Sequence, residues 1–118
     1  MTVLHRGVTQ ESWNKMTLMV QMANIGSEVE RTIRGKYKGD ADECRYALFR
    51  ALDLIDLTRQ DSKNRRQLKE LCRMRELLCD TYFGDNVWNQ TDEQWQKYFM
   101  YFAWCAAYER SLARSKSA

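Results

Sequence analysis

The chain has 118 residues, of which 44% are hydrophobic and 30% are charged. This length allows one domain with a single core, and the composition is too apolar for a disordered chain. The net charge of +3 at pH 7 is too small to identify a partner by itself. Proline is absent, which favours long uninterrupted helices over a β-sandwich or a loop-rich fold.

The sequence carries no sign of a membrane segment or of export. No apolar run approaches the roughly 18 residues that span a bilayer, and the N-terminus lacks the apolar stretch of a signal peptide. The cysteines lack a Cys-x-x-Cys pair, which indicates reduced, buried thiols rather than disulfides or a zinc site. They are Cys44, Cys72, Cys79 and Cys105. We therefore expect a cytoplasmic protein that does not contact a membrane.

Residues 1–11 are predicted to be a flexible lead-in to one domain that covers residues 12–115. The first helix is expected over about residues 12–37, because apolar side chains recur there every three or four residues. They are Leu18, Met22, Ile25, Val29 and Ile33. Gly35 and Gly39 mark its end, and Gly26 inside it indicates a close approach of another helix.

Asp40 and Glu43 form a capping-box pattern that begins the second helix. This helix should end within residues 58–61, where the apolar pattern fails. A third helix is then predicted from Ser62 or Asn64 to residue 83. Short connections between long helices place neighbours antiparallel, so the expected fold is all-α, an antiparallel up-down four-helix bundle.

Thr91 and Gln94 form a second capping box, which begins the fourth helix. The loop before this helix carries Trp88, which is either folded back as a lid over the end of the bundle, the alternative that we favour, or exposed for a partner. The middle of the helix is apolar on nearly all sides, which is typical of an interface. The predicted interface residues of a homo-oligomer are Tyr98, Tyr101, Trp104 and Tyr108.

Basic residues gather at the second connection. Residues 59–75 contain seven Lys and Arg residues against two acidic ones, and an up-down bundle places this segment at the same end as the chain termini. The resulting cluster suits RNA or DNA phosphates, although it also fits a solvated end that complements helix C-terminal dipoles. The predicted contact residues are Arg59, Lys63, Arg65, Arg66, Lys69, Arg110 and Arg114. At the opposite end, three basic residues are expected near three acidic ones that offset them: Arg34, Lys36 and Lys38 near Asp85, Asp92 and Glu93.

Carboxylates on the first three helices allow two interpretations. One is a structural ion-pair network, such as Glu28 with Arg50 and Asp53 with Arg73. The other is a Mg²⁺-dependent nucleotide pyrophosphohydrolase, although the second carboxylate pair departs from the spacing of that all-helical class. Its candidate residues are Glu28, Asp53, Asp56, Glu76 and Asp80. The single histidine, His5, leaves no paired metal ligands or catalytic triad, so we expect no catalytic residue, metal or cofactor.

Three blocks resemble a family of small, uncharacterised bacterial four-helix-bundle proteins. They are residues 23–31 (ANIGSEVER), 47–58 (ALFRALDLIDLT) and 91–99 (TDEQWQKYF). The size and layout are also similar to the 23S rRNA intervening-sequence proteins and to the accessory variability determinant of retroelements. That resemblance implies an oligomer that binds nucleic acid and a protein partner. From the apolar excess of the fourth helix and from the basic end, we expect a non-enzymatic, self-associating interaction module whose basic end is available to a nucleic acid or an acidic protein.

Overall fold

The computed structural model describes residues 8–117, and this part of the chain contains helices and no strand. The expected all-α fold is therefore confirmed. None of the described helices is long and apolar enough to cross a bilayer. In chain order the elements are α1 (Gln10–Asn14), α2 (Leu18–Lys38), α3 (Ala41–Gln60), the 3₁₀ helix η1 (Ser62–Gln67), α4 (Leu68–Tyr82) and α5 (Asp92–Ser117).

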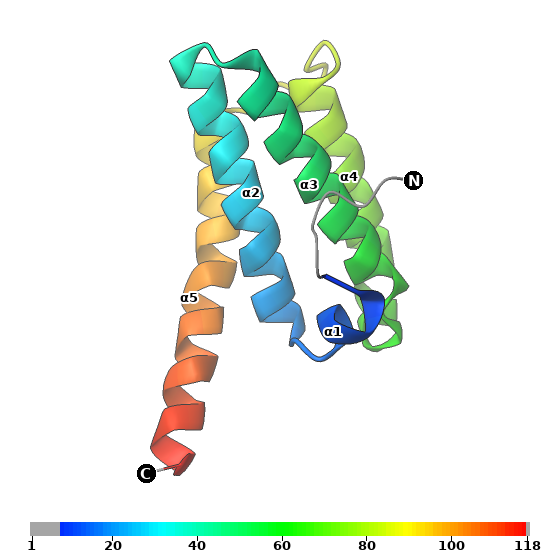
Figure 1. Cartoon of the computed structure of the whole chain (residues 1–118). Coiled ribbons are helices and arrows are strands. Elements are labelled where there is room, and N and C mark those ends of the chain that lie inside the picture. The colour runs from blue at the N-terminus through cyan, green and yellow to red at the C-terminus, as the bar shows by residue number, and fades with distance from the viewer. Residues whose placement is uncertain (1–7, 118) are drawn as a thin grey trace.

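The helix α2 is the centre of the molecule. It packs against α3 on one side and α5 on the other, and α4 packs against α3 (Figure 1). The helices α4 and α5 share few close backbone contacts. The C-terminal part of α5 projects beyond the other helices (Figure 1), and residues 110–116 are exposed.

One apolar core joins all five α-helices. Ile25 of α2, Leu48 and Ile55 of α3, and Leu78 of α4 are fully buried in it, and α5 contributes Trp95. The predicted stripe of the first long helix lies in this core, with Leu18 at its edge. The hydrophobic effect on these interlocking faces therefore holds the helices together.

The prediction of a single helix over residues 12–37 is wrong, because the chain forms two helices there. Thr9 caps α1, and Thr17 begins α2 by accepting a hydrogen bond from the backbone N–H of Val20. The break between them lets α1 turn across the end of α2 and bury Trp13 against α3. Residues 10 and 11 of the expected lead-in belong to α1, while residues 1–7 lie outside the described residues.

The remaining helix boundaries agree more closely with expectation. The side chain of Asp40 caps α3, which ends at Gln60 as expected. The expected third helix begins instead as η1 and becomes α-helical at Leu68. Thr91 and Gln94 form the predicted capping box, in which each side chain accepts a hydrogen bond from the other residue's backbone N–H.

The prediction that Trp88 folds back over the end of the bundle is wrong, because this residue is 69% exposed. The carboxylate of Asp80 on α4 fixes the loop of residues 83–91 by accepting hydrogen bonds from the backbone N–H groups of Val87 and Trp88, while both of these residues are 69% exposed. Two residues of this loop, Asn86 and Asn89, also adopt positive φ angles, 51° and 53°, which asparagine tolerates better than most residues.

Gly26 lies at a close approach of another helix, as the sequence predicted, and that helix is α5. A Cβ atom built on Gly26 would lie 2.7 Å from the Cβ of Phe99, which is too close for two carbon atoms. Phe99 is itself buried and stacks on Trp95, so it has little room to move. Any side chain at position 26 therefore pushes α5 away from α2.

We expect Gly26→Ala to lower the free energy of unfolding by about 1–2 kcal/mol in urea denaturation. In an exposed helix the same change is stabilising by about 1 kcal/mol, so the sign of the effect reports the contact with Phe99. Ser27→Ala, at the exposed neighbouring position, is the matched control and should change stability little. A Gly26→Ala protein that is more stable than the wild type would contradict the close approach.

Candidate nucleic-acid interface

A buried polar network joins α1, α2, α3 and η1 at one end of the molecule. The Gln21 amide donates to the carbonyl of Trp13 and to the carboxylate of Asp61, each at 2.9 Å. Asn64 donates to the Gln21 side-chain oxygen at 2.8 Å, and the Trp13 indole donates to Thr58 at 2.9 Å. All five side chains are buried, so the network fixes where η1 sits.

This network determines which way η1 faces. Asp61 caps η1 by accepting a hydrogen bond from the backbone N–H of Lys63, and its carboxylate also receives the Lys63 ammonium. Burial alone would raise the pKa of Asp61, but the hydrogen bonds from Lys63 and Gln21 outweigh burial and hold the pKa below its usual value. With Asn64 pointing inward, the side chains of Arg65 and Arg66 lie on the outside.

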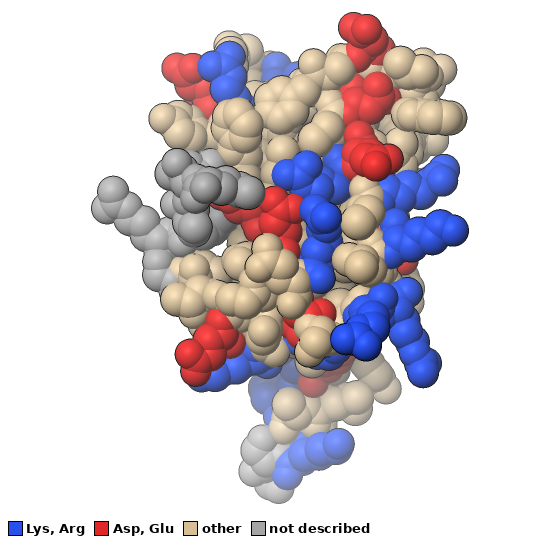
Figure 2. All heavy atoms as spheres, turned by 90° about the vertical axis from the view of Figure 1, so that its right-hand side faces the viewer, with Lys and Arg blue, Asp and Glu red and all other residues tan. Residues whose placement is uncertain are grey.

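Six basic residues form a surface on α3, η1 and α4 that we call the basic face. They are Arg59, Lys63, Arg65, Arg66, Lys69 and Arg73, and all are exposed. Figure 2 shows Lys and Arg side chains gathered over the middle and lower right of the side where α4 lies. Arg59 pairs with Asp56 at 2.9 Å, whereas Arg65, Arg66, Lys69 and Arg73 form no ion pair within residues 8–117.

The structure brings together five of the seven residues predicted to contact nucleic acid and adds Arg73 to them. Arg110 and Arg114 are exposed on the projecting part of α5. This part and η1 lie toward the same end of the molecule, but Figure 1 shows them on opposite sides of α2. The single basic cluster expected at this end is therefore divided into two surfaces.

Three of the five carboxylates considered for a Mg²⁺ site, those of Glu28, Asp56 and Asp80, are engaged with cations or backbone N–H groups. Glu28 pairs with Arg31 at 2.9 Å and with Arg50 at 3.0 Å, which confirms the predicted Glu28–Arg50 pair. The second predicted pair joined Asp53 of α3 to Arg73 of α4. In the structure, the ion pair between these two helices is instead that of Asp56 with Arg75, at 2.8 Å. No group of three or more metal-binding side chains occurs in the described chain.

The opposite end of the molecule contains a compensated charge cluster. Asp92 is buried and accepts hydrogen bonds from the Lys36 ammonium at 2.9 Å and from the Tyr82 hydroxyl at 2.7 Å. Burial would raise the pKa of Asp92, but these hydrogen bonds outweigh it and lower the pKa. The predicted proximity of Lys36 and Asp92 is confirmed, and it leaves no unpaired cation at this contact.

Three of the four predicted interface residues form an exposed aromatic ridge on α5. Tyr101, Trp104 and Tyr108 are 60%, 70% and 66% exposed. Tyr98 is an exception, because its ring turns inward and packs edge-on against Phe99. Helical spacing alone could not show that Tyr98 is partly buried while the other three residues are exposed, because this difference depends on the position of α4.

The four cysteines are free thiols, but the expectation that they are buried is wrong. Cys44, Cys72, Cys79 and Cys105 are all half-buried, at the edges of helix contacts rather than in the core. Burial raises the pKa of Cys44 and of Cys79, so these two thiols are less reactive than a free cysteine at neutral pH.

Comparisons with other proteins assign no family to this geometry. No protein-family model, curated protein or solved structure matches the chain. The resemblance to bacterial four-helix-bundle proteins is therefore still an expectation, and a function has to come from the residues described above.

The depressed pKa of Asp61 predicts acid destabilisation. Its ion-pair contribution is fully present above the pKa of an unfolded aspartate, about 3.9, and is lost as the pH falls through the lower folded pKa. We expect Asp61→Asn to lose about 1–3 kcal/mol of unfolding free energy at pH 7, and the difference from the wild type to shrink below about pH 4. Asp85→Asn, at an exposed loop position, is the control. A constant difference from pH 7 to pH 2 would contradict this assignment.

Proposed function

We propose that the protein is a non-enzymatic helical interaction module that contacts nucleic acid through the basic face and associates with a second copy through α5. The observation that carries the nucleic-acid contact is the exposure of Arg65, Arg66, Lys69 and Arg73 without a carboxylate partner in the described chain. Unpaired cations on a rigid surface attract phosphates by Coulomb energy and by release of counterions. The proposal agrees with what the sequence resemblance implies.

The arrangement of the helices supports this function. We infer that the chain is an open form of the antiparallel up-down four-helix bundle, in which α2 joins two helix pairs and the seam between α4 and α5 is not fully closed. The unpaired cysteines suit a reducing compartment, and we propose the cytoplasm. A bundle of this kind presents separate faces, so one face is available for nucleic acid while another binds a protein.

Self-association is supported by the shape and size of the exposed surface of α5. Trp104 stands between two apolar grooves, one lined by the small residues Ala23 and Gly26 of α2 and the other by Met19 and Tyr108. The ridge and its apolar neighbours offer about 500 Å² per copy, or about 1,000 Å² in a pair, which reaches the lower limit for a specific interface. The Trp104 ring of one copy can therefore insert into an apolar groove of the other copy.

The hydrolase hypothesis receives less support from the geometry. A catalytic Mg²⁺ needs several carboxylates that converge on it, with oxygens free to bind the ion. Here the guanidinium groups of Arg50 and Arg75 bind Glu28 and Asp56, and Asp80 binds the backbone of the loop. These contacts stabilise helix register and direct the carboxylate oxygens away from a shared ion.

The basic face predicts salt-sensitive binding to single-stranded RNA. With four phosphate contacts, the logarithm of the association constant should fall against the logarithm of salt concentration with a slope of about −3. We expect the double variant Arg65→Glu, Arg66→Glu to weaken binding at least tenfold in fluorescence anisotropy. The control is Arg34→Glu, Arg45→Glu, which changes net charge equally at exposed positions toward the other end. If both double variants lost the same affinity for RNA, net charge alone would explain the effect, and the proposal of a defined basic face would be contradicted.

The aromatic ridge predicts a concentration-dependent oligomer. We expect Trp104→Glu to yield a monomer in analytical ultracentrifugation at concentrations where the wild type is associated, because the charge would be buried in the interface. Trp88→Glu is a closely matched control, since Trp88 is 69% exposed against 70% for Trp104. A wild-type protein that is monomeric at 100 micromolar, about tenfold above ordinary assay concentrations, would exclude self-association at any useful strength.

A further inference from the structure

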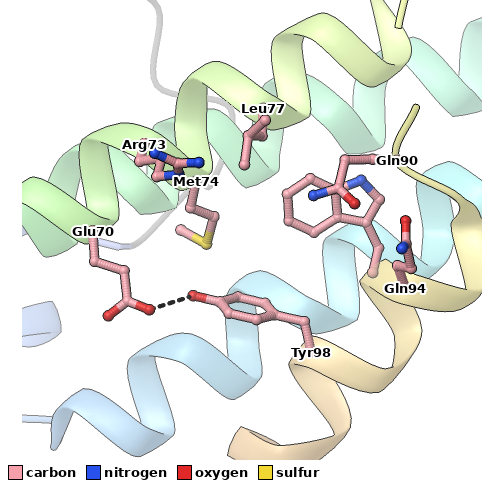
Figure 3. Close-up of a pocket in the computed structure, with 8 residues that line it drawn as sticks. Glu70, Arg73, Met74, Leu77, Gln90, Gln94 and Tyr98 are labelled. Carbon is pink, nitrogen blue, oxygen red and sulfur yellow. Dashed lines mark hydrogen bonds between the residues drawn. The ribbon is translucent and has the colours of Figure 1, made fainter. Parts of the chain in front are cut away.

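A small pocket lies between α4 and α5, at the seam where the two helices share few backbone contacts. Its volume is about 260 Å³. Met74 and Leu77 of α4 and the ring of Trp95 form its apolar part, and the ring of Tyr98 closes one side (Figure 3). Trp95 is only 4% exposed and forms the base of the pocket, so the partly exposed ring of Tyr98 is its accessible aromatic wall.

Polar side chains form the rim of this α4–α5 pocket. Glu70 and Arg73 come from α4, Gln90 comes from the preceding loop, and Gln94 comes from the first turn of α5. Figure 3 shows these side chains around the aromatic rings. The pocket therefore combines apolar walls with hydrogen-bonding groups at its edge, which is typical of a site for a flat polar ligand.

Hydrogen bonds hold the two rings in position. The indole N–H of Trp95 donates to Thr81 at 3.2 Å, and the hydroxyl of Tyr98 donates to Glu70 at 3.4 Å. Burial, reinforced by the charge of Glu70, raises the pKa of Tyr98, so its hydroxyl keeps its proton at neutral pH. The walls are therefore set by contacts within the chain.

Arg73 belongs both to the pocket and to the basic face. Its side chain lines the pocket and is exposed, and it forms no ion pair in the described chain. Lys69 lies one helical turn earlier on α4 and is also exposed. A nucleic-acid strand whose phosphates contact these two residues would pass directly by the mouth of the pocket.

We propose that the α4–α5 pocket binds one unstacked base of a single-stranded nucleic acid whose phosphates lie on the basic face. This inference rests on the nucleic-acid contact proposed above. Aromatic rings stack on any base, and single strands present bases that are free to leave the stack. The pocket is slightly smaller than the roughly 300–1,000 Å³ that holds a drug-sized ligand, so it suits a base with its sugar and phosphate outside.

Glu70 gives the pocket a preference among bases. A carboxylate only accepts hydrogen bonds, and it therefore favours a base with an exocyclic amine at its edge. Cytosine carries an amine where uracil carries a carbonyl oxygen, which the carboxylate repels. The pocket therefore binds cytosine in preference to uracil, while Gln90 and Gln94 accommodate either kind of edge group.

The test compares three labelled RNA octamers with the same number of phosphates: all cytidine, all uridine and all abasic. Fluorescence anisotropy with the full chain should give at least about fivefold tighter binding of the cytidine octamer than of the abasic one, with uridine between them. Equal affinities for the cytidine and abasic octamers would overturn the base pocket and leave the basic face intact. Failure of all three to bind would overturn both.

Two variants separate the pocket from the phosphates. Leu77→Trp fills the pocket, so it should reduce cytidine-octamer binding to the abasic level and leave abasic binding unchanged. Leu68→Trp adds the same ring at an exposed position of α4 and should preserve the preference for cytidine. If the Leu77→Trp variant does not fold, as circular dichroism would show, the Glu70→Gln variant replaces it as the test, because Glu70 is exposed. It should remove the preference for cytidine over uridine, and an unchanged preference would overturn the assignment of Glu70.

A competition experiment distinguishes a strand from a free nucleotide. Cytidine 5′-monophosphate should displace the cytidine octamer only at concentrations at least a hundredfold above those of unlabelled octamer, since a single phosphate forms few contacts with the basic face. Displacement at comparable concentrations would show that the pocket binds free nucleotides, and it would overturn the proposal of a strand.

Discussion

The structure depends on one buried amide. Gln21 is fully buried. Its side chain donates hydrogen bonds to Trp13 of α1 and to Asp61, the N-cap of η1, and it accepts one from Asn64 of η1. A buried amide that loses a partner costs about 1–3 kcal/mol, whereas a complete network specifies one arrangement of its members. Because Asp61 and Asn64 both bind this amide, the direction of η1 follows from it. The exposure of Arg65 and Arg66 is thus a consequence of polar groups that are themselves inaccessible to solvent.

The balance between acidic and basic side chains differs between the two ends of the molecule. At the end that holds Asp92, this buried carboxylate and the Lys36 ammonium satisfy each other, and the exposed cations Arg34 and Arg45 share this end with exposed acidic residues such as Asp42 and Glu93. At the η1 end, Lys63 pairs with the buried carboxylate of Asp61 and Arg59 pairs with Asp56, while the other four cations of the basic face form no ion pair within residues 8–117. This asymmetry separates a structural ion pair from a surface that can bind an anion, and it supports the function proposed for the basic face.

Local signals in the sequence predicted local features well. The caps at Asp40 and Thr91 and the ion pair of Glu28 with Arg50 depend on short-range hydrogen bonds or helix spacing, and the structure confirms them. The break at Thr17 was missed because its apolar neighbours continue the helical pattern on both sides. The pocket could not be predicted at all. Its basic member, Arg73, lies 22 and 25 residues before its aromatic members, Trp95 and Tyr98, on a separate helix, and only the packing of α4 beside α5 brings them together.

The spacing of two glycines restricts how this chain can change in length. Gly26 meets α5, and a Cβ atom at Gly35 would lie 2.7 Å from the backbone nitrogen of Cys44 on α3, so α2 is in close contact with a different neighbour at each position. One residue inserted or deleted between them would rotate one glycine by about 100° relative to the other and place a bulky side chain in one of the contacts. Variation in length among related chains should therefore concentrate in the loop of residues 83–91, and the interval from 26 to 35 should keep its length.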